Sequence, residues 1–166
     1  IVIDFNKLER YAHHIKGDDC FFCIGTTKKQ TPNKEEYRKI EYTLPVKIGE
    51  IAFKNKVNKF VYISSLGSSI NSKNTYLKNK AEVEIKLKNL NFSQLAIIRP
   101  SLLLGKRKDF RFGELIAQKF FTFFSFLFFG PIRKYKPISS YIVSKTIIII
   151  VEKNLKDIYF NSDFLM

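Results

Sequence analysis

The stretch that decides the fold covers residues 59–100 and reads KFVYISSLGSSINSKNTYLKNKAEVEIKLKNLNFSQLAIIRP. It contains two apolar runs, Phe60–Ser64 and Leu95–Ile98, each of a length that suits one buried strand. Between them lie a loop rich in Gly, Ser and Asn and then Thr75–Leu90, which is rich in helix-forming residues. This order of strand, loop, helix and strand is typical of two parallel strands joined by a crossover helix.

The same alternation extends in both directions along the chain. Other apolar runs predict further strands at Ile1–Ile3, Phe21–Ile24 and Ile158–Phe160. Helical patterns predict four more helices, at Phe5–Lys16, from about Asn33 to Lys56, at Phe112–Phe124 and at Ser139–Asn154. We therefore expect an α/β fold with a parallel sheet between two helical layers, in one domain that spans residues 1–166.

Five residues predict how the first two helices begin, bend and end. Asp4 is placed to cap the first helix, and Gly17 to end it. Asn33 forms a capping-box pattern with Glu36 at the start of the second helix. Pro45 falls inside that second helix, where its missing N–H should produce a kink.

The composition is that of a basic globular chain, with 45% hydrophobic residues and a net charge of +14. A basic balance can indicate a phosphate-bearing partner or an anionic membrane. The lysines are spread along the whole sequence, however, and no block of five or six basic residues occurs. We interpret the charge as compositional drift and expect no nucleic-acid partner.

Cys20 and Cys23 are the two cysteines of the chain, and no secretion signal precedes them. That pattern favours a reducing, cytoplasmic setting. Residues three apart on a strand point to opposite faces, and His13 and His14 make a poor second ligand pair. We therefore expect no metal site.

A phenylalanine-rich run, FFTFFSFLFF, covers residues 120–129. It is shorter than the roughly 20 residues that a membrane-spanning helix needs, so we expect no transmembrane segment. A buried helix is the commonest fate of such a run, while a lid over an apolar substrate and a membrane-facing patch stay open.

The residues best suited to chemistry are Ser65, Tyr76 and Lys80. Tyr76 and Lys80 are four apart, so on a helix their side chains lie on one face, one turn apart. A lysine ammonium near a phenol favours the phenolate and lowers its pKa from about 10. Tyr76 could then exchange a proton with a carbonyl or alcohol, which Ser65 at the end of a strand would position.

Three runs resemble the atypical short-chain dehydrogenases: FVYISSLG at residues 60–67, YLKNK at 76–80 and IRPSLLLGKR at 98–107. The branch that they resemble is named after the HIV Tat-interacting protein. Residues 23–27 (CIGTT) are similar to its strand-end segment beside the cofactor, and residues 130–138 (GPIRKYKPI) to its substrate-side region. The combined order of these motifs is far more specific than any single one.

The resemblance implies a Rossmann-type doubly wound sheet, NADP or NAD as cofactor, and a small carbonyl or alcohol substrate. It implies that Ser65, Tyr76 and Lys80 are catalytic. It also implies a set of cofactor-binding residues, which comprises Ile24, Gly25, Tyr76, Lys80, Leu103 and Arg111.

The sequence departs from the family in its glycines. The family begins with a strand, a GxxGxxG loop and a helix whose amino terminus holds the pyrophosphate. The 7 glycines of this chain are never spaced that way, and its only methionine is Met166. We therefore expect that the first βαβα unit is absent, through natural truncation or trimming, and that the fragment is inactive.

Two functional hypotheses follow from the resemblance. The first is an NAD(P)-dependent oxidoreductase, and the second is an NAD(P)H-binding regulatory protein that acts through protein partners without catalysis. The joint presence of Ser65, Tyr76 and Lys80 favours the first. A basic protein that binds phosphates or a membrane is a weaker third hypothesis, and the oligomeric state stays open.

Overall fold

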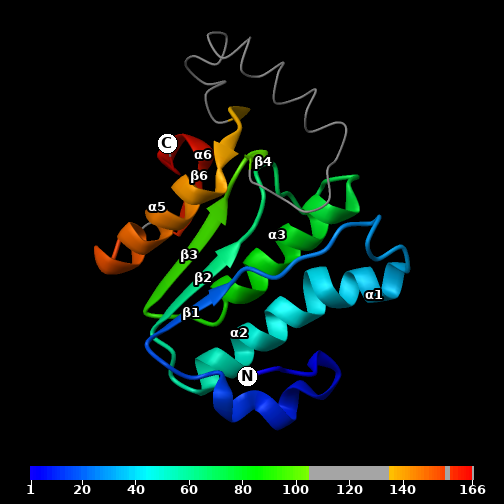
Figure 1. Ribbon diagram of the computed structural model, residues 1–166, viewed down its shortest axis with the longest axis vertical. Coiled ribbons are helices and arrows are strands. Elements are labelled where there is room, and N and C mark those ends of the chain that lie inside the picture. Colours follow the sequence, from blue (N-terminus) through cyan, green and yellow to red (C-terminus); the bar gives the residue numbers. More distant parts are fainter. Residues whose placement is uncertain (105–134, 156–157, 166) are drawn as a thin grey trace.

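The computed structural model describes residues 1–104, 135–155 and 158–165 (Figure 1). Its main sheet has four parallel strands in the order β1-β2-β3-β6. They are β1 (Asp19–Phe22), β2 (Lys59–Ile63), β3 (Gln94–Arg99) and β6 (Tyr159–Asn161). In the register of the sheet, Phe60 pairs with Leu95, and Ile98 pairs with Phe160. The predicted α/β fold with a parallel sheet is confirmed.

Helices cover both faces of this sheet. On one side lie α2 (Leu44–Lys54) and α3 (Thr75–Lys88), and on the other lies α5 (Ser140–Glu152), followed after β6 by the short α6 (Ser162–Leu165) (Figure 1). Successive strand residues point to opposite faces, and the two central strands, β2 and β3, each contribute to two clusters of buried residues. The predicted three-layer arrangement therefore holds in the described part of the chain.

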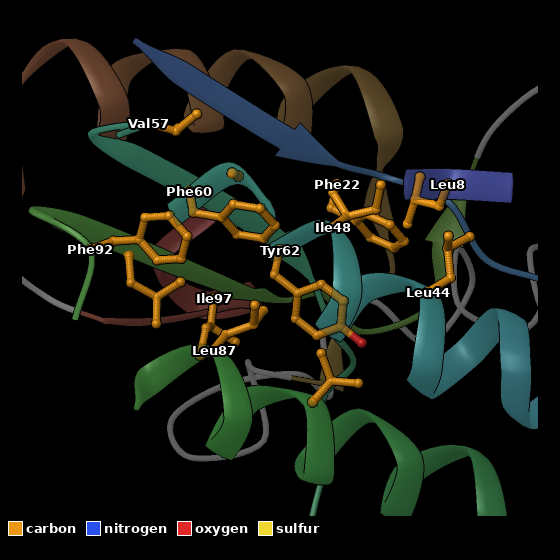
Figure 2. Packing of buried hydrophobic residues seen from close by; sticks show 13 residues of the cluster. Leu8, Phe22, Leu44, Ile48, Val57, Phe60, Tyr62, Leu87, Phe92 and Ile97 are labelled. Carbon is orange, nitrogen blue, oxygen red and sulfur yellow. The ribbon is translucent and has the colours of Figure 1, made fainter. Parts of the chain in front are cut away.

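The larger cluster lies between the sheet and the helices α2 and α3. Figure 2 shows Phe60 and Tyr62 of β2 gathered there with Ile97 of β3 and Leu87 of α3. The neighbouring positions along the same strands, Val61, Ala96 and Ile98, pack on the opposite face with residues of α5. This alternation explains why both strands read as continuous apolar runs in the sequence.

The helical segment before β2 is irregular next to Pro45, where the sequence predicted a kink. Asn33 caps α1 (Lys34–Arg38), accepting hydrogen bonds from the N–H groups of Glu35 and Glu36. A π-helical turn, η2 (Lys39–Thr43), then leads into α2. Proline has no N–H to donate to the carbonyl four residues earlier, so one α-helical hydrogen bond cannot form there. The wider π-helical turn lies at this position.

The segment before β1 differs from the prediction. Residues 1–3 form no strand, and Asp19–Phe22 pairs only with β2 among the described residues, so Ile1–Ile3 has no ladder partner there. The predicted helix at Phe5–Lys16 is a 3-10 helix, η1 (Phe5–His14), which Asp4 caps as expected. Its carboxyl-terminal cap is Ile15, two residues before Gly17.

The other outer elements agree with the sequence, apart from one unexpected pairing. The helix α5 lies within the expected segment Ser139–Asn154. The strand β6 lies within one residue of the expected segment Ile158–Phe160. Two short strands, β4 (Leu103–Leu104) and β5 (Ile138–Ser139), form a small second sheet that the sequence did not predict. The expected helix at Phe112–Phe124 and the phenylalanine-rich run lie outside the described residues. No helix in the described part is both long and apolar enough to cross a membrane.

The contact between α2 and α3 gives a test of this packing. A Cβ atom at Gly49 would lie 2.3 Å from Cδ2 of Leu87, whose side chain is fully buried. We expect Gly49→Ala to destabilise the fold by about 1–3 kcal/mol, although alanine favours a helix interior over glycine by about 1 kcal/mol.

In a Leu87→Ala background the added methyl group would fill empty space, so the same Gly49→Ala change should become stabilising. Denaturant unfolding of the four proteins measures both effects. An equal effect of Gly49→Ala in the two backgrounds would contradict this packing.

Candidate functional site

The carboxyl edge of the main sheet brings together the strand ends and the start of α3. Asn74 caps α3 by accepting a hydrogen bond from the N–H of Tyr76 at 2.9 Å. The ammonium nitrogen of Lys80 lies 5.6 Å from the centroid of the Tyr76 ring and 4.9 Å from that of Tyr62. The structure therefore brings the predicted pair, Tyr76 and Lys80, to the same place.

Lys80 is almost completely buried and forms an ion pair with Glu41. Its Nζ lies 3.2 Å from Oε2 of Glu41 and donates a hydrogen bond to the carbonyl of Ile63 at 3.1 Å. Burial lowers the pKa of the Lys80 ammonium, while the carboxylates of Glu41 and Glu84 oppose that shift. The ion pair thus helps a lysine in an apolar setting to keep its charge.

Glu41 also holds the loop that follows β1. Its Oε1 accepts a hydrogen bond from the N–H of Thr26 at 2.5 Å. A Cβ atom at Gly25 would lie 3.2 Å from the same oxygen, so a residue without a side chain fits there best. One carboxylate therefore joins the predicted cofactor-side residue Gly25 to the predicted catalytic residue Lys80.

Glu41 is not among the site residues that the sequence predicted. The signal for it was its position: it lies four residues after Tyr37 and seven before Ile48, both of which are buried on the same helical segment. An acidic residue on the apolar face of a helix needs a partner in the protein interior. The sequence alone does not tell which lysine that partner is.

A second buried carboxylate, Glu84, lies one turn beyond Lys80 on α3. It accepts hydrogen bonds from the hydroxyl of Ser64 and from Nε and Nη2 of Arg99. The guanidinium of Arg99 in turn lies 4.2 Å from the ring centroid of Tyr159. Glu84 thereby joins the carboxyl ends of β2 and β3 to α3, beside the lysine.

Two further tyrosines face this cluster, and their phenols are poor acids. Burial raises the pKa of Tyr37 to about 12, and the charges of Glu41 and Tyr76 act in the same direction. Burial likewise raises the pKa of Tyr62, whose hydroxyl has no hydrogen-bond partner among the described residues. Both phenols therefore stay neutral near pH 7, and Tyr76 is the partly exposed member of the group.

The structure places the remaining predicted site residues in different surroundings. Ser65 follows β2 directly after Ser64, and its hydroxyl donates to the carbonyl of Leu66 at 3.4 Å. Ile24 is exposed and lines an apolar groove beside β1, whereas Leu103 lies in β4 and packs against the cluster on the α5 side. Arg111 lies outside the described residues.

The described part of the chain gathers no group of three or more His, Cys, Asp or Glu side chains that could hold a metal ion. Cys20 and Cys23 are both free, and burial raises the pKa of each thiol. A thiol with a raised pKa is a weak nucleophile and a weak metal ligand at neutral pH.

The buried ion pair can be tested by a double-mutant cycle. Glu41→Gln leaves the Lys80 ammonium buried without its ion-pair partner, so we expect it to cost about 3–5 kcal/mol of unfolding free energy. Lys80→Met should cost a similar amount, and the Glu41→Gln/Lys80→Met double variant much less than the sum.

The matched control for this cycle is Lys47→Met, because Lys47 pairs with Glu9 at 3.1 Å on the surface. An exposed pair of that kind contributes about 0–1 kcal/mol. Strictly additive effects of the two buried substitutions in denaturant unfolding would show that Glu41 and Lys80 do not interact.

Several known proteins are similar to this chain in sequence. Protein HTATIP2 of Rattus norvegicus is 36% identical over 121 residues, which are 72% of this chain and 50% of that protein. The mitochondrial protein FMP52 of Candida albicans is 32% identical over 105 residues, which are 63% of this chain and 46% of that protein. The chain thus spans about half the length of the curated relatives it matches. No protein-family model matches it.

The names of these relatives correct one expectation. The FMP52 proteins of several fungi are named mitochondrial, so the expected cytoplasmic location is wrong. That expectation rested on free cysteines and on a missing secretion signal, which indicate a reducing compartment without identifying it.

Solved structures share the fold at low sequence identity. A dTDP-4-dehydrorhamnose reductase from Yersinia enterocolitica matches with a TM-score of 0.65 and 17% identity, over 96% of this chain and 62% of that one. MoeE5, in complex with UDP-glucose and NAD, matches with a TM-score of 0.55 and 16% identity, over 70% of this chain and 46% of that one. The homology and the shared fold together show an atypical short-chain dehydrogenase/reductase that resembles the Tat-interacting-protein-like proteins.

Proposed function

We propose that this chain carries the proton-transfer and ribose-binding part of an NAD(P)-dependent oxidoreductase that acts on a carbonyl or alcohol. In this proposal Tyr76 exchanges the proton with the substrate oxygen, and Ser65 helps to position that oxygen. Lys80 stabilises the phenolate form of Tyr76 and contacts a ribose hydroxyl. Glu41 is a positioning residue that acts through Lys80.

The observation that carries the proposal is the location of the Lys80 ammonium 5.6 Å from the centroid of the Tyr76 ring, at the carboxyl edge of a parallel sheet. Open α/β sheets bind their ligands at that edge. The positive charge favours the phenolate of a nearby tyrosine, while the neighbouring phenols of Tyr37 and Tyr62 stay protonated. Among these three tyrosines, Tyr76 is therefore the one suited to proton exchange near neutral pH.

The hydrogen-bonding capacity of Lys80 fits a role toward a ribose. An ammonium group has three N–H donors. Glu41 and the carbonyl of Ile63 account for two acceptors, which leaves capacity for a third. A ribose hydroxyl or the Tyr76 oxygen is an acceptor of the required kind.

The loop after β1 supplies a second surface for a cofactor. Gly25 leaves the backbone open on its exposed side, and the hydrogen bond from Thr26 to Glu41 fixes the loop. A bound nicotinamide cofactor would supply the hydride of the reaction. Ile24, Gly25, Leu103 and Arg111, carried over from the family resemblance, would lie on its ribose and nicotinamide side.

We also propose that the 166-residue chain by itself binds NAD(P) weakly and turns over little. Its sequence contains no GxxGxxG loop, and a helix amino terminus behind such a loop supplies the backbone N–H groups that meet a diphosphate. Fusing a glycine-rich strand–loop–helix unit ahead of Ile1 should therefore confer NAD(P)H binding.

In the fused protein we expect Tyr76→Phe to leave the NADPH dissociation constant nearly unchanged while lowering kcat by about 100-fold or more. The substitution removes a proton and keeps the ring. Calorimetric titration with NADPH and reduction of a panel of small aldehydes and ketones measure the two quantities. Tyr11→Phe removes the same atom from η1 and should change neither.

The outcomes separate the two functional hypotheses. Full activity of the Tyr76→Phe variant would contradict the assignment of the proton-transfer residue. Cofactor binding without turnover of any carbonyl by the unsubstituted fusion would favour the regulatory alternative, which acts through protein partners.

A further inference from the structure

The helix α5 covers one face of the main sheet (Figure 1). The side of α5 opposite its buried residues exposes an apolar stripe. The inner side of the helix is buried in the core through Val143, Ile147, Ile150 and Val151. At 100° per residue, the opposite side collects six exposed residues within an arc of about 120°. These six residues form the α5 stripe: Tyr141, Ile142, Lys145, Ile148, Ile149 and Glu152.

The stripe distinguishes α5 from the other described helices by its number of exposed apolar side chains. Tyr141, Ile142, Ile148 and Ile149 are all exposed large hydrophobic residues, and Ile148 is 53% exposed. Each of the other described helices has at most one exposed residue of that kind. Single exposed apolar residues are ordinary, whereas a contiguous apolar surface indicates an interaction site.

The two charges of the stripe are placed symmetrically. Lys145 lies three residues before Ile148, and Glu152 lies three residues after Ile149. The two helices of an antiparallel pair, related by a twofold axis between residues 148 and 149, would place each residue opposite the one at the mirrored position. Lys145 would then face Glu152 of the second copy, twice, with the isoleucines in contact between them.

We propose that the α5 stripe is a self-association surface, on which α5 of a second copy of this chain packs antiparallel. With isoleucines at the centre and opposite charges at the two ends, the stripe is complementary to a second copy of itself, as a twofold interface requires. In a parallel pair, by contrast, each charge would face its own kind. Glu152 makes no ion pair within the described part of the chain, so it is available to a partner.

Sedimentation equilibrium over a wide concentration range tests this proposal with the 166-residue chain. We expect a reversible dimer, and Ile148→Glu or Ile149→Glu should leave a monomer, because each places a charge at the centre of the interface. Circular dichroism would show whether these variants keep their fold. A chain that stays monomeric at every concentration would overturn the proposal.

Charge reversal tests the antiparallel geometry. Lys145→Glu and Glu152→Lys should each raise the dimer dissociation constant by about tenfold or more, because like charges then face each other. The Lys145→Glu/Glu152→Lys double variant should restore dimerisation. The control is Lys86→Glu, the same change on the exposed side of α3, which should have little effect.

Two results would overturn the geometry or the choice of partner. Failure of the double variant to recover would contradict the antiparallel pairing. Binding of a monomeric chain to vesicles of anionic phospholipid, lost in Ile148→Glu, would show that the stripe meets a membrane surface instead of a second copy.

Discussion

The ion pair between Glu41 and Lys80 is the interaction on which the site depends. Both side chains are almost completely buried, with the atoms of opposite charge 3.2 Å apart. Taking two charges out of water is costly, and a buried pair of this kind is weak evidence for stability. What the pair provides is position: it fixes the lysine beside Tyr76 and, through Thr26, fixes the loop that follows β1.

Several features of the fold are consistent with this constraint. The π-helical turn before Pro45 contains Glu41. The ammonium of Lys80, which pairs with Glu41, also donates a hydrogen bond to the carbonyl of Ile63 at the end of β2. Gly25 allows the loop to approach the carboxylate closely. A second buried carboxylate, Glu84, accepts hydrogen bonds from Ser64 after β2 and from Arg99 at the end of β3. The carboxylates of Glu41 and Glu84 thus both bind groups at the carboxyl edge of the sheet.

The pattern of apolar runs and helix-forming residues in the sequence was enough to predict the parallel sheet and its helices, because β2 and β3 are buried along almost their whole length. It was wrong for Ile1–Ile3, since an apolar run becomes a strand only where a neighbour completes its hydrogen bonds. The sequence predicted Tyr76 and Lys80 as a pair through their spacing. It could not predict Glu41, because that contact joins helical segments 39 residues apart and depends on tertiary packing.

Amide hydrogen exchange at Thr26 tests most directly whether Glu41 ties the loop to the lysine. We expect a protected Thr26 amide in the parent chain, and exchange at least about tenfold faster in a Glu41→Leu/Lys80→Met variant, which removes the acceptor and both charges. The amide of Val61 in β2 should stay protected in both proteins, which shows that the sheet is intact. A Thr26 amide that exchanges freely in the parent, or equally slowly in both, would contradict the account.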